Sequence, residues 1–315
     1  MALSGIALVT GGAGFIGSHI AAALLESGAR VRVIDNLSTG YEKNIKAIGS
    51  DVDFVRGDVG DEQALNKVLS DVELIFHEAA IPSVPRSVDR PTETHQASVD
   101  ATFKLLLAAR DHKVRRVIYA ASSSAYGDQP DLPKREDMRP APLSPYAVAK
   151  LVGEYYCQVF TRVYGLETVS LRYFNVFGPR QDPTSQYSGV ISRFMSALLT
   201  GTQPVIYGDG EHSRDFTYIS NVIDANLRAA ESASAVGEIM NIANGQRTTL
   251  NELLEVMKAV TGKSKVTARY EAPRAGDVRD SLADLTRARG LLRYEPRVSL
   301  EEGLKLTFDW WQKNG

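Results

Sequence analysis

Thr10-Gly11-Gly12-Ala13-Gly14-Phe15-Ile16-Gly17 is the stretch that decides the fold of this 315-residue chain. An apolar run at residues 6–9 precedes it and apolar residues at helical spacing follow it, which predicts a strand, a glycine-rich turn and a helix. The glycines allow a tight turn, a close approach to a pyrophosphate and close packing of the helix against the strand. We therefore expect a dinucleotide at the N-terminus of the helix, in contact with Gly11, Gly14, Phe15, Ile16 and Gly17.

The second predicted strand, residues 31–34, ends at Asp35, and Asn36 follows it. A carboxylate at this position suits the hydroxyl groups of a ribose, and we expect both residues to contact the cofactor. Asp35 would repel a 2′-phosphate, and no arginine follows it closely. We therefore interpret the cofactor as NAD rather than NADP.

Helical patterns separate the further strands, which are predicted at residues 52–55, 74–76, 117–120 and 168–172. This alternation predicts an α/β fold, with a doubly wound parallel Rossmann sheet that helices cover on both faces. Asp58 and Val59 follow the third strand and are candidates for contact with the adenine edge. The small residues Ala79 and Ala80 follow the fourth strand and would leave room for the cofactor.

The regular alternation ends after Asn175. Residues 176–183 are predicted to form a loop that leaves the sheet, and the remainder mixes short strands with helices. We therefore expect a Rossmann domain that binds NAD over residues 1–178, to which segments near 214–243 return. A smaller mixed α/β domain over residues 179–315 would bind mainly the substrate.

Tyr146 and Lys150 stand four residues apart in a predicted helix, residues 145–164, and so lie on one face of it. A nearby ammonium favours the phenolate and lowers the pKa of a tyrosine from its free value of about 10, which would make Tyr146 a base. Such pairs are common in helices without a catalytic role. This pair gains weight because three hydroxyl groups stand at the end of the preceding predicted strand, where a doubly wound sheet places its chemistry: Ser122, Ser123 and Ser124.

The composition argues against several classes of function. Lys plus Arg is 36 and Asp plus Glu is 38, for a net charge of -2, which does not suit a nucleic-acid surface or a polybasic membrane anchor. Cys157 is the only cysteine, so we expect no disulfide framework and no metal site. No apolar run reaches the about 18 residues of a membrane span, and the start lacks a signal peptide. We expect a soluble, cytoplasmic protein.

The glycine turn, Asp35, the serine run and the Tyr146/Lys150 pair, taken in order, resemble the extended short-chain dehydrogenases/reductases. Within that superfamily the chain is similar to the nucleotide-sugar 4-epimerases, the group of the UDP-glucose and UDP-N-acetylglucosamine 4-epimerases. The resemblance covers nearly the whole chain, because four further motifs match in order: Leu171-Arg-Tyr-Phe-Asn175, Gly208-Asp-Gly210, Ser213-Arg-Asp-Phe216 and Arg274-Ala-Gly-Asp277.

The resemblance implies epimerisation at carbon 4 of a UDP-hexose, through a transient 4-keto sugar, with tightly held NAD. Tyr146 would be the base, Ser122 would relay its proton with help from Ser123, and Lys150 would bind the nicotinamide ribose. Dehydratases of the same superfamily carry an acidic residue directly after the relay hydroxyl. Here those positions are Ser123 and Ser124, so 4,6-dehydration is not expected.

The resemblance also implies which residues bind the substrate. Asn175, Arg214 and Arg274 fall at family positions that contact the nucleotide diphosphate, and Asp277 is a candidate for contact with a ribose hydroxyl. Ser281 resembles the family's size gate for the group on sugar carbon 2, and a small residue there leaves room for an N-acetyl group. The other expected substrate contacts are Ser83, Ser122, Ser124, Gly189 and Val190.

We therefore expect UDP-GlcNAc and UDP-GalNAc as substrates, with UDP-Glc and UDP-Gal as a second pair. A UDP-glucuronate or UDP-pentose 4-epimerase remains an alternative, and a non-catalytic NAD-binding sensor is an alternative from a different class. The resemblance also implies a homodimer, in which helices near residues 94–110 and 145–164 of each subunit form a four-helix bundle. Within the subunit we expect part of the second helix to pack on the sheet through Val152, Tyr155, Val159 and Val163.

Overall fold

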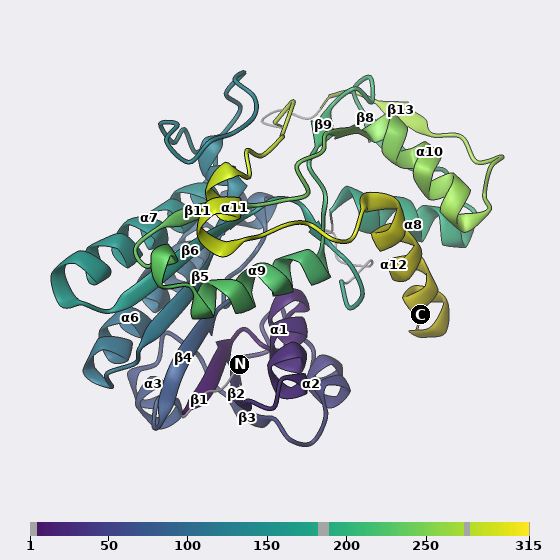
Figure 1. Cartoon of the computed structure of the whole chain (residues 1–315). Helices are drawn as coiled ribbons and strands as arrows, with labels where there is room; N and C mark the ends of the chain where they lie inside the picture. Colours follow the sequence, from purple (N-terminus) through teal and green to yellow (C-terminus); the bar gives the residue numbers. More distant parts are fainter. Residues whose placement is uncertain (1–4, 182–188, 274–277, 315) are drawn as a thin grey trace.

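The computed structural model of the chain describes residues 5–181, 189–273 and 278–314 (Figure 1). Seven of the strands in these ranges form one parallel sheet in the order β11-β6-β5-β4-β1-β2-β3. They are β1 (Ile6–Thr10), β2 (Arg30–Asp35), β3 (Asp53–Arg56), β4 (Val72–His77), β5 (Arg116–Ser122), β6 (Glu167–Tyr173) and β11 (Ile239–Ile242). The strand order reverses between β1 and β4, which is where a sheet of this kind opens a crevice for ligands.

Helices cover both faces of this sheet, so the predicted doubly wound architecture is confirmed. One face packs against α1 (Phe15–Glu26), α2 (Glu42–Ile48) and α9 (Ile219–Glu231). The other packs against α3 (Glu62–Val68), α6 (Ala101–Asp111) and α7 (Pro145–Val159). The shorter or peripheral helices are α4 (Val84–Asp89), α5 (Pro91–His95), α8 (Val190–Thr200), α10 (Leu250–Thr261), α11 (Thr286–Leu292), α12 (Leu300–Asn314) and the 3-10 turns η2 (Ser123–Tyr126) and η4 (Ala233–Ala235).

Small two-stranded sheets lie beside the main sheet, next to α8, α10 and α12 (Figure 1). They pair β7 (Val176–Phe177) with β10 (Thr217–Tyr218), β8 (Val205–Tyr207) with β13 (Arg269–Glu271), and β9 (Ser213–Arg214) with β12 (Thr248–Thr249). The chain returns from this region to the main sheet, because β11 pairs with β6. The domain boundary near residue 178 stays a prediction.

The structure corrects two predicted elements. The single helix expected at residues 94–109 is divided into α5, a π-helical turn η1 (Gln96–Asp100) and α6. At this turn the Thr102 hydroxyl donates to the Ser98 carbonyl at 2.7 Å, a side-chain bond of the kind that bends helices. The loop expected at residues 176–183 begins with β7, whose pairing with β10, 41 residues further on at Thr217↔Val176, is not visible as a local pattern.

Helix α7 turns a different face to the sheet from the one expected. Tyr155, Val159 and Val163 are 50%, 47% and 65% exposed and point away from it. The buried face carries small residues instead, and a Cβ on Gly153 would lie 2.2 Å from the Tyr119 hydroxyl oxygen on β5. At Gly153 the helix therefore lies too close to β5 for any side chain, and Tyr155, Val159 and Val163 are left on the outer face.

A π-helical turn, η3 (Phe160–Tyr164), continues α7 to the end of the predicted helix. Elsewhere α10 begins with a capping box, in which Thr249 and Glu252 each bond the other's backbone N–H. Cys157 is buried. Among the helices of the described ranges, none has the length and apolar character to cross a membrane.

Candidate active site

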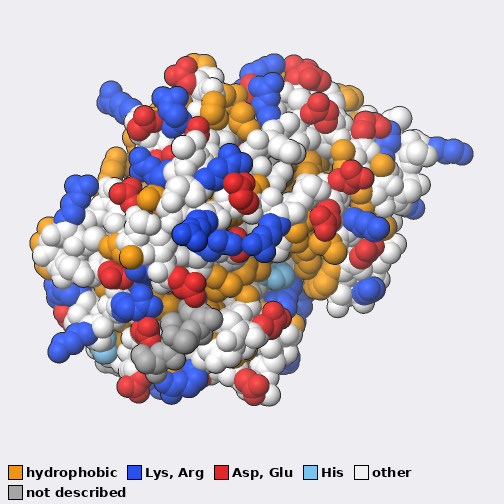
Figure 2. Space-filling view, in the orientation of Figure 1, with side chains coloured by type: hydrophobic (Ala, Val, Ile, Leu, Met, Phe, Trp, Pro, Cys, Tyr) orange, Lys and Arg blue, Asp and Glu red, His pale blue; other side chains and the backbone are white. Residues whose placement is uncertain are grey.

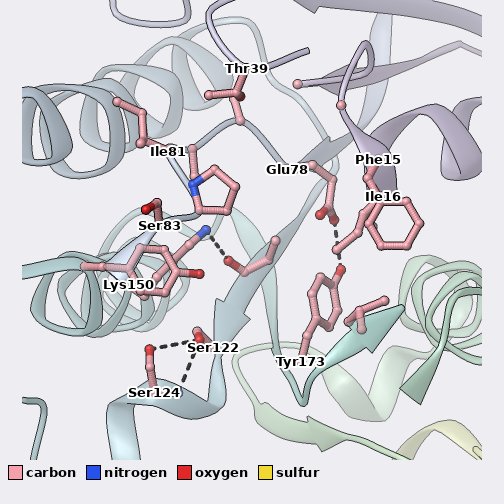
Figure 3. Close-up of a pocket in the computed structure, with 18 of the residues that line it drawn as sticks. Phe15, Ile16, Thr39, Glu78, Ile81, Ser83, Ser122, Ser124, Lys150 and Tyr173 are labelled. Atoms are coloured by element: carbon pink, nitrogen blue, oxygen red, sulfur yellow. Dashed lines mark hydrogen bonds between the residues drawn. The ribbon is translucent and has the colours of Figure 1, made fainter. Parts of the chain in front are cut away.

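A cavity of about 860 Å³ opens at the carboxyl ends of the sheet strands and brings most of the predicted site residues together (Figure 3). Val190 begins α8 next to the cavity without lining it, and Arg274 and Asp277 lie outside the described residues. The predicted residues that line the cavity are Gly11, Gly14, Phe15, Ile16, Gly17, Asp35, Asn36, Asp58, Val59, Ala79, Ala80, Ser83, Ser122, Ser123, Ser124, Tyr146, Lys150, Asn175, Gly189, Arg214 and Ser281.

The glycine turn after β1 leaves no space for side chains. Gly11 has a φ of +70, and a Cβ there would lie 2.7 Å from the backbone nitrogen of Ala79. A Cβ on Gly17 would lie 2.4 Å from the Gly11 carbonyl oxygen. No side chain caps the N-terminus of α1, which begins after Gly14. Backbone N–H groups and the positive end of the helix dipole therefore face the cavity, as a pyrophosphate requires.

Asp35 is held at the end of β2 by two backbone donors. Its Oδ2 accepts from Ala13 N at 2.9 Å and its Oδ1 accepts from Leu37 N at 2.7 Å. Burial raises the pKa of this carboxyl, and the two backbone bonds oppose that shift. Each oxygen keeps a further lone pair for a ribose hydroxyl. Asn36 donates to Asp58 at 2.7 Å, which ties the expected ribose and adenine positions together.

Lys150 and Tyr146 reach the cavity from the first turns of α7. The Lys150 ammonium donates to the Ala120 carbonyl oxygen at 2.7 Å and lies 5.2 Å from the centre of the Tyr119 ring. Burial raises the pKa of Tyr146, a hydrogen bond from Ser122 opposes the rise, and Glu78 adds to it. Burial of the phenol is therefore the largest effect on this pKa, and the expected lowering by Lys150 stays a prediction.

The three serines after β5 are not equivalent. Ser124 Oγ donates to Ser122 Oγ at 2.9 Å, and the Ser124 backbone N–H donates to the same oxygen at 3.2 Å (Figure 3). A hydroxyl carries one proton, and the bond between Ser122 and Tyr146 lowers the pKa of the phenol, which is the effect of Ser122 acting as the donor. The bonds therefore run from Ser124 through Ser122 to Tyr146, a direction that favours a phenolate at Tyr146. The sequence indicated a substrate contact for Ser124 but not this bond.

His77 lies on β4, the strand next to β5, and its neutral imidazole is held between two threonine hydroxyl groups. Thr102 gives its one hydroxyl proton to Ser98 O, so it must accept from His77 Nε2 at 2.9 Å. His77 Nδ1 is then the acceptor for the Thr10 hydroxyl at 2.8 Å, and Thr10 accepts from Ala79 N at 3.2 Å. Burial lowers the pKa of His77 to about 3. The chain of bonds joins β1, β4 and the π-helical turn below the cofactor side of the cavity.

The substrate side of the cavity is tied together by Asp215. Its carboxylate accepts from Asn244 N at 2.9 Å, Gly245 N at 3.1 Å and Ala283 N at 3.1 Å. Its carbonyl oxygen accepts from Asn175 Nδ2 at 3.0 Å, and Asn175 has a φ of +36, which is strained for a residue with a side chain. This strain is held at a residue that lines the cavity.

Arg214 and Ser281 are neighbours on this side. Arg214 Nη1 donates to the Ser213 carbonyl at 2.9 Å, and Ser281 N donates to the same residue's carbonyl at 3.1 Å. The guanidinium thus stands beside the predicted size gate, and both line the cavity. A guanidinium in this place suits a diphosphate.

Two functional candidates were missed by the sequence reasoning. Glu78 directly follows β4 and lines the cavity, and the Tyr173 hydroxyl of β6 donates to its Oε1 at 2.8 Å. The available signal was position, because an acidic residue at the carboxyl end of a buried parallel strand stands where the serines after β5 stand. The cavity, the glycine turn and the tyrosine–lysine pair together define a dinucleotide-dependent enzyme.

Residues 7–243 match the model of the NAD dependent epimerase/dehydratase family. The structure is similar to a UDP-glucose 4-epimerase from Thermotoga maritima with UDP-glucose, at 40% identity, 98% and 99% coverage of the two chains and a TM-score of 0.93. It is equally similar to a UDP-N-acetylglucosamine 4-epimerase from Methanobrevibacter ruminantium in complex with UDP-N-acetylmuramic acid, at 40% identity, 99% coverage of both chains and a TM-score of 0.93.

A third solved structure is a UDP-glucuronic acid 4-epimerase from Bacillus cereus in complex with UDP-glucuronic acid and NAD. It is 33% identical over 98% of this chain and 100% of that one, with a TM-score of 0.91. The chain therefore belongs to the NAD dependent epimerase/dehydratase family, among the UDP-sugar 4-epimerases, and its cofactor is NAD. The resemblance seen in the sequence is confirmed.

The direction of the serine bonds leads to a test. Ser124→Ala removes the donor that orients Ser122, and we expect kcat for epimerisation to fall about fivefold, the equivalent of one ordinary hydrogen bond. Ser124→Thr keeps the hydroxyl and should keep most of the activity. Steady-state kinetics on the NAD-loaded variants makes the comparison. Equal losses in both variants would show that the hydroxyl of Ser124 does not orient the relay.

Proposed function

We propose that this protein interconverts the carbon-4 epimers of UDP-GlcNAc and UDP-GalNAc, and also accepts UDP-Glc and UDP-Gal. The observation that carries the reaction type is the convergence of Tyr146, Lys150 and the Ser122 relay on one cavity with the glycine turn. The similarity of the chain to 4-epimerases named for different UDP-sugars supports epimerisation at carbon 4. The identity of the sugar is proposed from the residues that line the cavity.

The chain's own residues would move one proton and would orient the sugar and the cofactor. Tyr146 takes the proton from the hydroxyl at carbon 4, and Ser122 holds that oxygen in line. Lys150, fixed by Ala120 O, orients the nicotinamide ribose. NAD supplies, when bound, a reversible acceptor for the hydrogen on carbon 4. The 4-keto sugar would then turn in the cavity, take back the hydride on the other face of carbon 4 and regain its proton from Tyr146, so that no net oxidation occurs.

The acetylated substrates are proposed from the small side chains around the sugar position. Ser281 is buried beside Arg214, so the group on carbon 2 would lie near a hydroxymethyl side chain rather than a large ring. Ser83 lines the same cavity, and its hydroxyl caps α4 by accepting from Arg86 N at 3.1 Å. Small side chains at these positions leave room for an N-acetyl group.

Two alternative functions differ from this proposal, one in its substrate and one in lacking catalysis. The Bacillus cereus relative carries UDP-glucuronic acid in its structure, so a uronate substrate, or a pentose one, is the second candidate. A sensor without catalysis would have no need of a proton relay, and the bonds from Ser124 through Ser122 toward Tyr146 speak for the enzyme.

A second copy of this chain is proposed as the partner of α7 and the neighbouring helices. Tyr155 and Val159 of α7 and Val163 of η3 are at least 47% exposed, and Phe103 of α6 is 36% exposed beside them. A shallow apolar groove continues this surface between α5 and the start of α7, lined by Pro91, Thr92, His95, Val99, Pro145, Val148, Ala149 and Val152. Two such surfaces brought together would form a four-helix bundle and cover the exposed side chains.

The substrate proposal is tested by incubating the purified protein with UDP-GlcNAc and, separately, with UDP-Glc, and separating the epimers by chromatography. We expect both to be converted, with UDP-GlcNAc at least as fast. Ser281→Tyr should lower kcat/KM for UDP-GlcNAc at least about tenfold relative to UDP-Glc, because a ring occupies the acetyl space. Ser281→Ala is the matched control and should keep the preference. An unchanged ratio of the kcat/KM values for UDP-GlcNAc and UDP-Glc in Ser281→Tyr would show that residue 281 is not the size gate. Turnover of UDP-uronates alone would show that the proposed substrates are wrong.

The dimer proposal predicts that Val159→Lys converts a dimer into a monomer, because an ammonium cannot be buried in an apolar bundle without a large loss. Light scattering coupled to size-exclusion chromatography measures the mass. Leu306→Lys is the control, since Leu306 is 42% exposed on α12, away from α7. A monomeric wild type would contradict the dimer proposal, and a dimer that survives Val159→Lys while Leu306→Lys disrupts it would place the interface elsewhere.

A further inference from the structure

Glu78 places a carboxylate in the catalytic part of the cavity. It directly follows β4, and its backbone N–H donates to the Thr10 carbonyl at the end of β1 at 3.2 Å, so the neighbouring strand fixes its backbone. Its side chain points into the cavity that Tyr146 and Lys150 also line, and toward Tyr173 (Figure 3). The surface of the molecule in Figure 2 mixes acidic and basic groups, whereas this acid stands inside.

The side-chain hydrogen bonds in this cluster run toward the Glu78 carboxylate. Tyr173 donates to Glu78 Oε1 at 2.8 Å, and Asn226 Nδ2 donates to the Tyr173 hydroxyl oxygen at 2.8 Å. Asn226 uses its amide group also for Val222 O at 2.8 Å. The competing bond from Tyr173 to Asn226 Oδ1 is longer, at 3.1 Å, and lacks the help of a charge. Two donors in series therefore stabilise the ionised carboxylate.

Four titratable side chains face Glu78 from the elements packed around it: Lys150 and Tyr146 of α7, Tyr119 of β5 and Tyr173 of β6. Lys150 is the cation of this group. Burial raises the pKa of Glu78 to about 7, because the Tyr173 bond and the Lys150 ammonium offset only part of that rise. Burial lowers the pKa of Lys150, and Glu78 opposes that fall. Each of the two charges therefore supports the other in the cavity.

We propose that Glu78 is the counter-charge of this active site, which balances the Lys150 ammonium through space and thereby sets how strongly Tyr146 holds its proton. The proposal rests on the proposed function, in which Tyr146 is the base. Glu78 acts as a positioning residue, since it works through Lys150 and Tyr146.

The consequence is a condition on when Tyr146 can act. With the ammonium balanced by Glu78, a phenolate at Tyr146 would add a second negative charge to a buried site. A further positive charge in the cavity removes that obstacle, and the oxidised nicotinamide ring is positively charged. The arrangement thus favours a cationic ligand beside Lys150 and makes the proton of Tyr146 available only when that ligand is bound.

The test compares the pKa of Tyr146 in the NAD-loaded wild type and in Glu78→Gln, which removes the charge and keeps the shape. Ultraviolet difference titration reads the phenolate, and subtraction of the matching Tyr146→Phe protein removes the signal of the other tyrosines. We expect the pKa of Tyr146 to fall by about one unit in Glu78→Gln, as the loss of a nearby like charge predicts. The acidic limb of the pH profile of kcat/KM should move in the same direction.

Two further variants make the result specific. Glu78→Asp keeps the charge and should stay near the wild-type pKa, which a purely structural role of the side chain would not produce. Glu73→Gln removes the same group from the other end of β4, where Glu73 pairs with Arg115, and should leave the pKa of Tyr146 unchanged. If Glu78→Gln does not fold, Glu78→Met takes its place, and failure of both neutral variants to fold would overturn the proposal in favour of a structural role.

The outcomes separate this proposal from the proposed function. An unchanged pKa of Tyr146 in Glu78→Gln, with normal epimerisation by the wild type, overturns the role of Glu78 alone. Absence of turnover by the wild type with every UDP-sugar overturns the proposed function, while the titration of Tyr146 still decides the role of Glu78. A fall in the pKa in both Glu78→Gln and Glu78→Asp would also contradict it, because the charge would then not be the cause.

Discussion

The burial of the Lys150 ammonium is the constraint on which the active site depends. Lys150 is 4% exposed, and a cation removed from water is costly unless its surroundings compensate it. The Ala120 carbonyl accepts a hydrogen bond from it at 2.7 Å, the Tyr119 ring lies 5.2 Å from it, and the charge of Glu78 favours its protonated form. Tyr119 and Ala120 lie in β5 and Glu78 directly follows the neighbouring strand β4, so the three partners come from two central strands of the sheet. The cavity opens at the carboxyl ends of these strands.

The same helix is fixed to the sheet by a second buried charge pair. Arg172 of β6 contacts Glu154 of α7 through two bonds, at 2.8 and 2.7 Å, and stacks at 4.7 Å on the Tyr126 ring. Glu154 stands one turn after Lys150, which stands one turn after Tyr146, so all three share the face that Gly153 brings close to β5. The close approach explains both the precision of the catalytic pair and the apolar side chains left on the outer face.

The sequence predicted the features that depend on local pattern. The glycine turn, Asp35, the alternation of six strands up to β6 and the tyrosine–lysine pair follow from spacing of neighbouring residues, and the structure brings the turn, Asp35 and the pair to one cavity. The sequence could not predict the features that depend on contacts between residues far apart in the chain. The Glu78 carboxylate is bonded by Tyr173, 95 residues further on, and the close approach of α7 to β5 depends on Gly153 against Tyr119. The raised pKa of Tyr146 likewise arises from burial, which no spacing of residues reveals.

The central claim is that the chain carries out a reversible oxidation at carbon 4 of a UDP-sugar in one closed cycle. The most direct measurement uses UDP-GlcNAc labelled with deuterium at carbon 4 of the sugar, incubated with the NAD-loaded protein in ordinary water. Mass spectrometry and nuclear magnetic resonance then locate the label in the UDP-GalNAc that forms. The account predicts full retention of deuterium at carbon 4 of the product. Loss of the label to water, or solvent hydrogen at the neighbouring carbons, would contradict it.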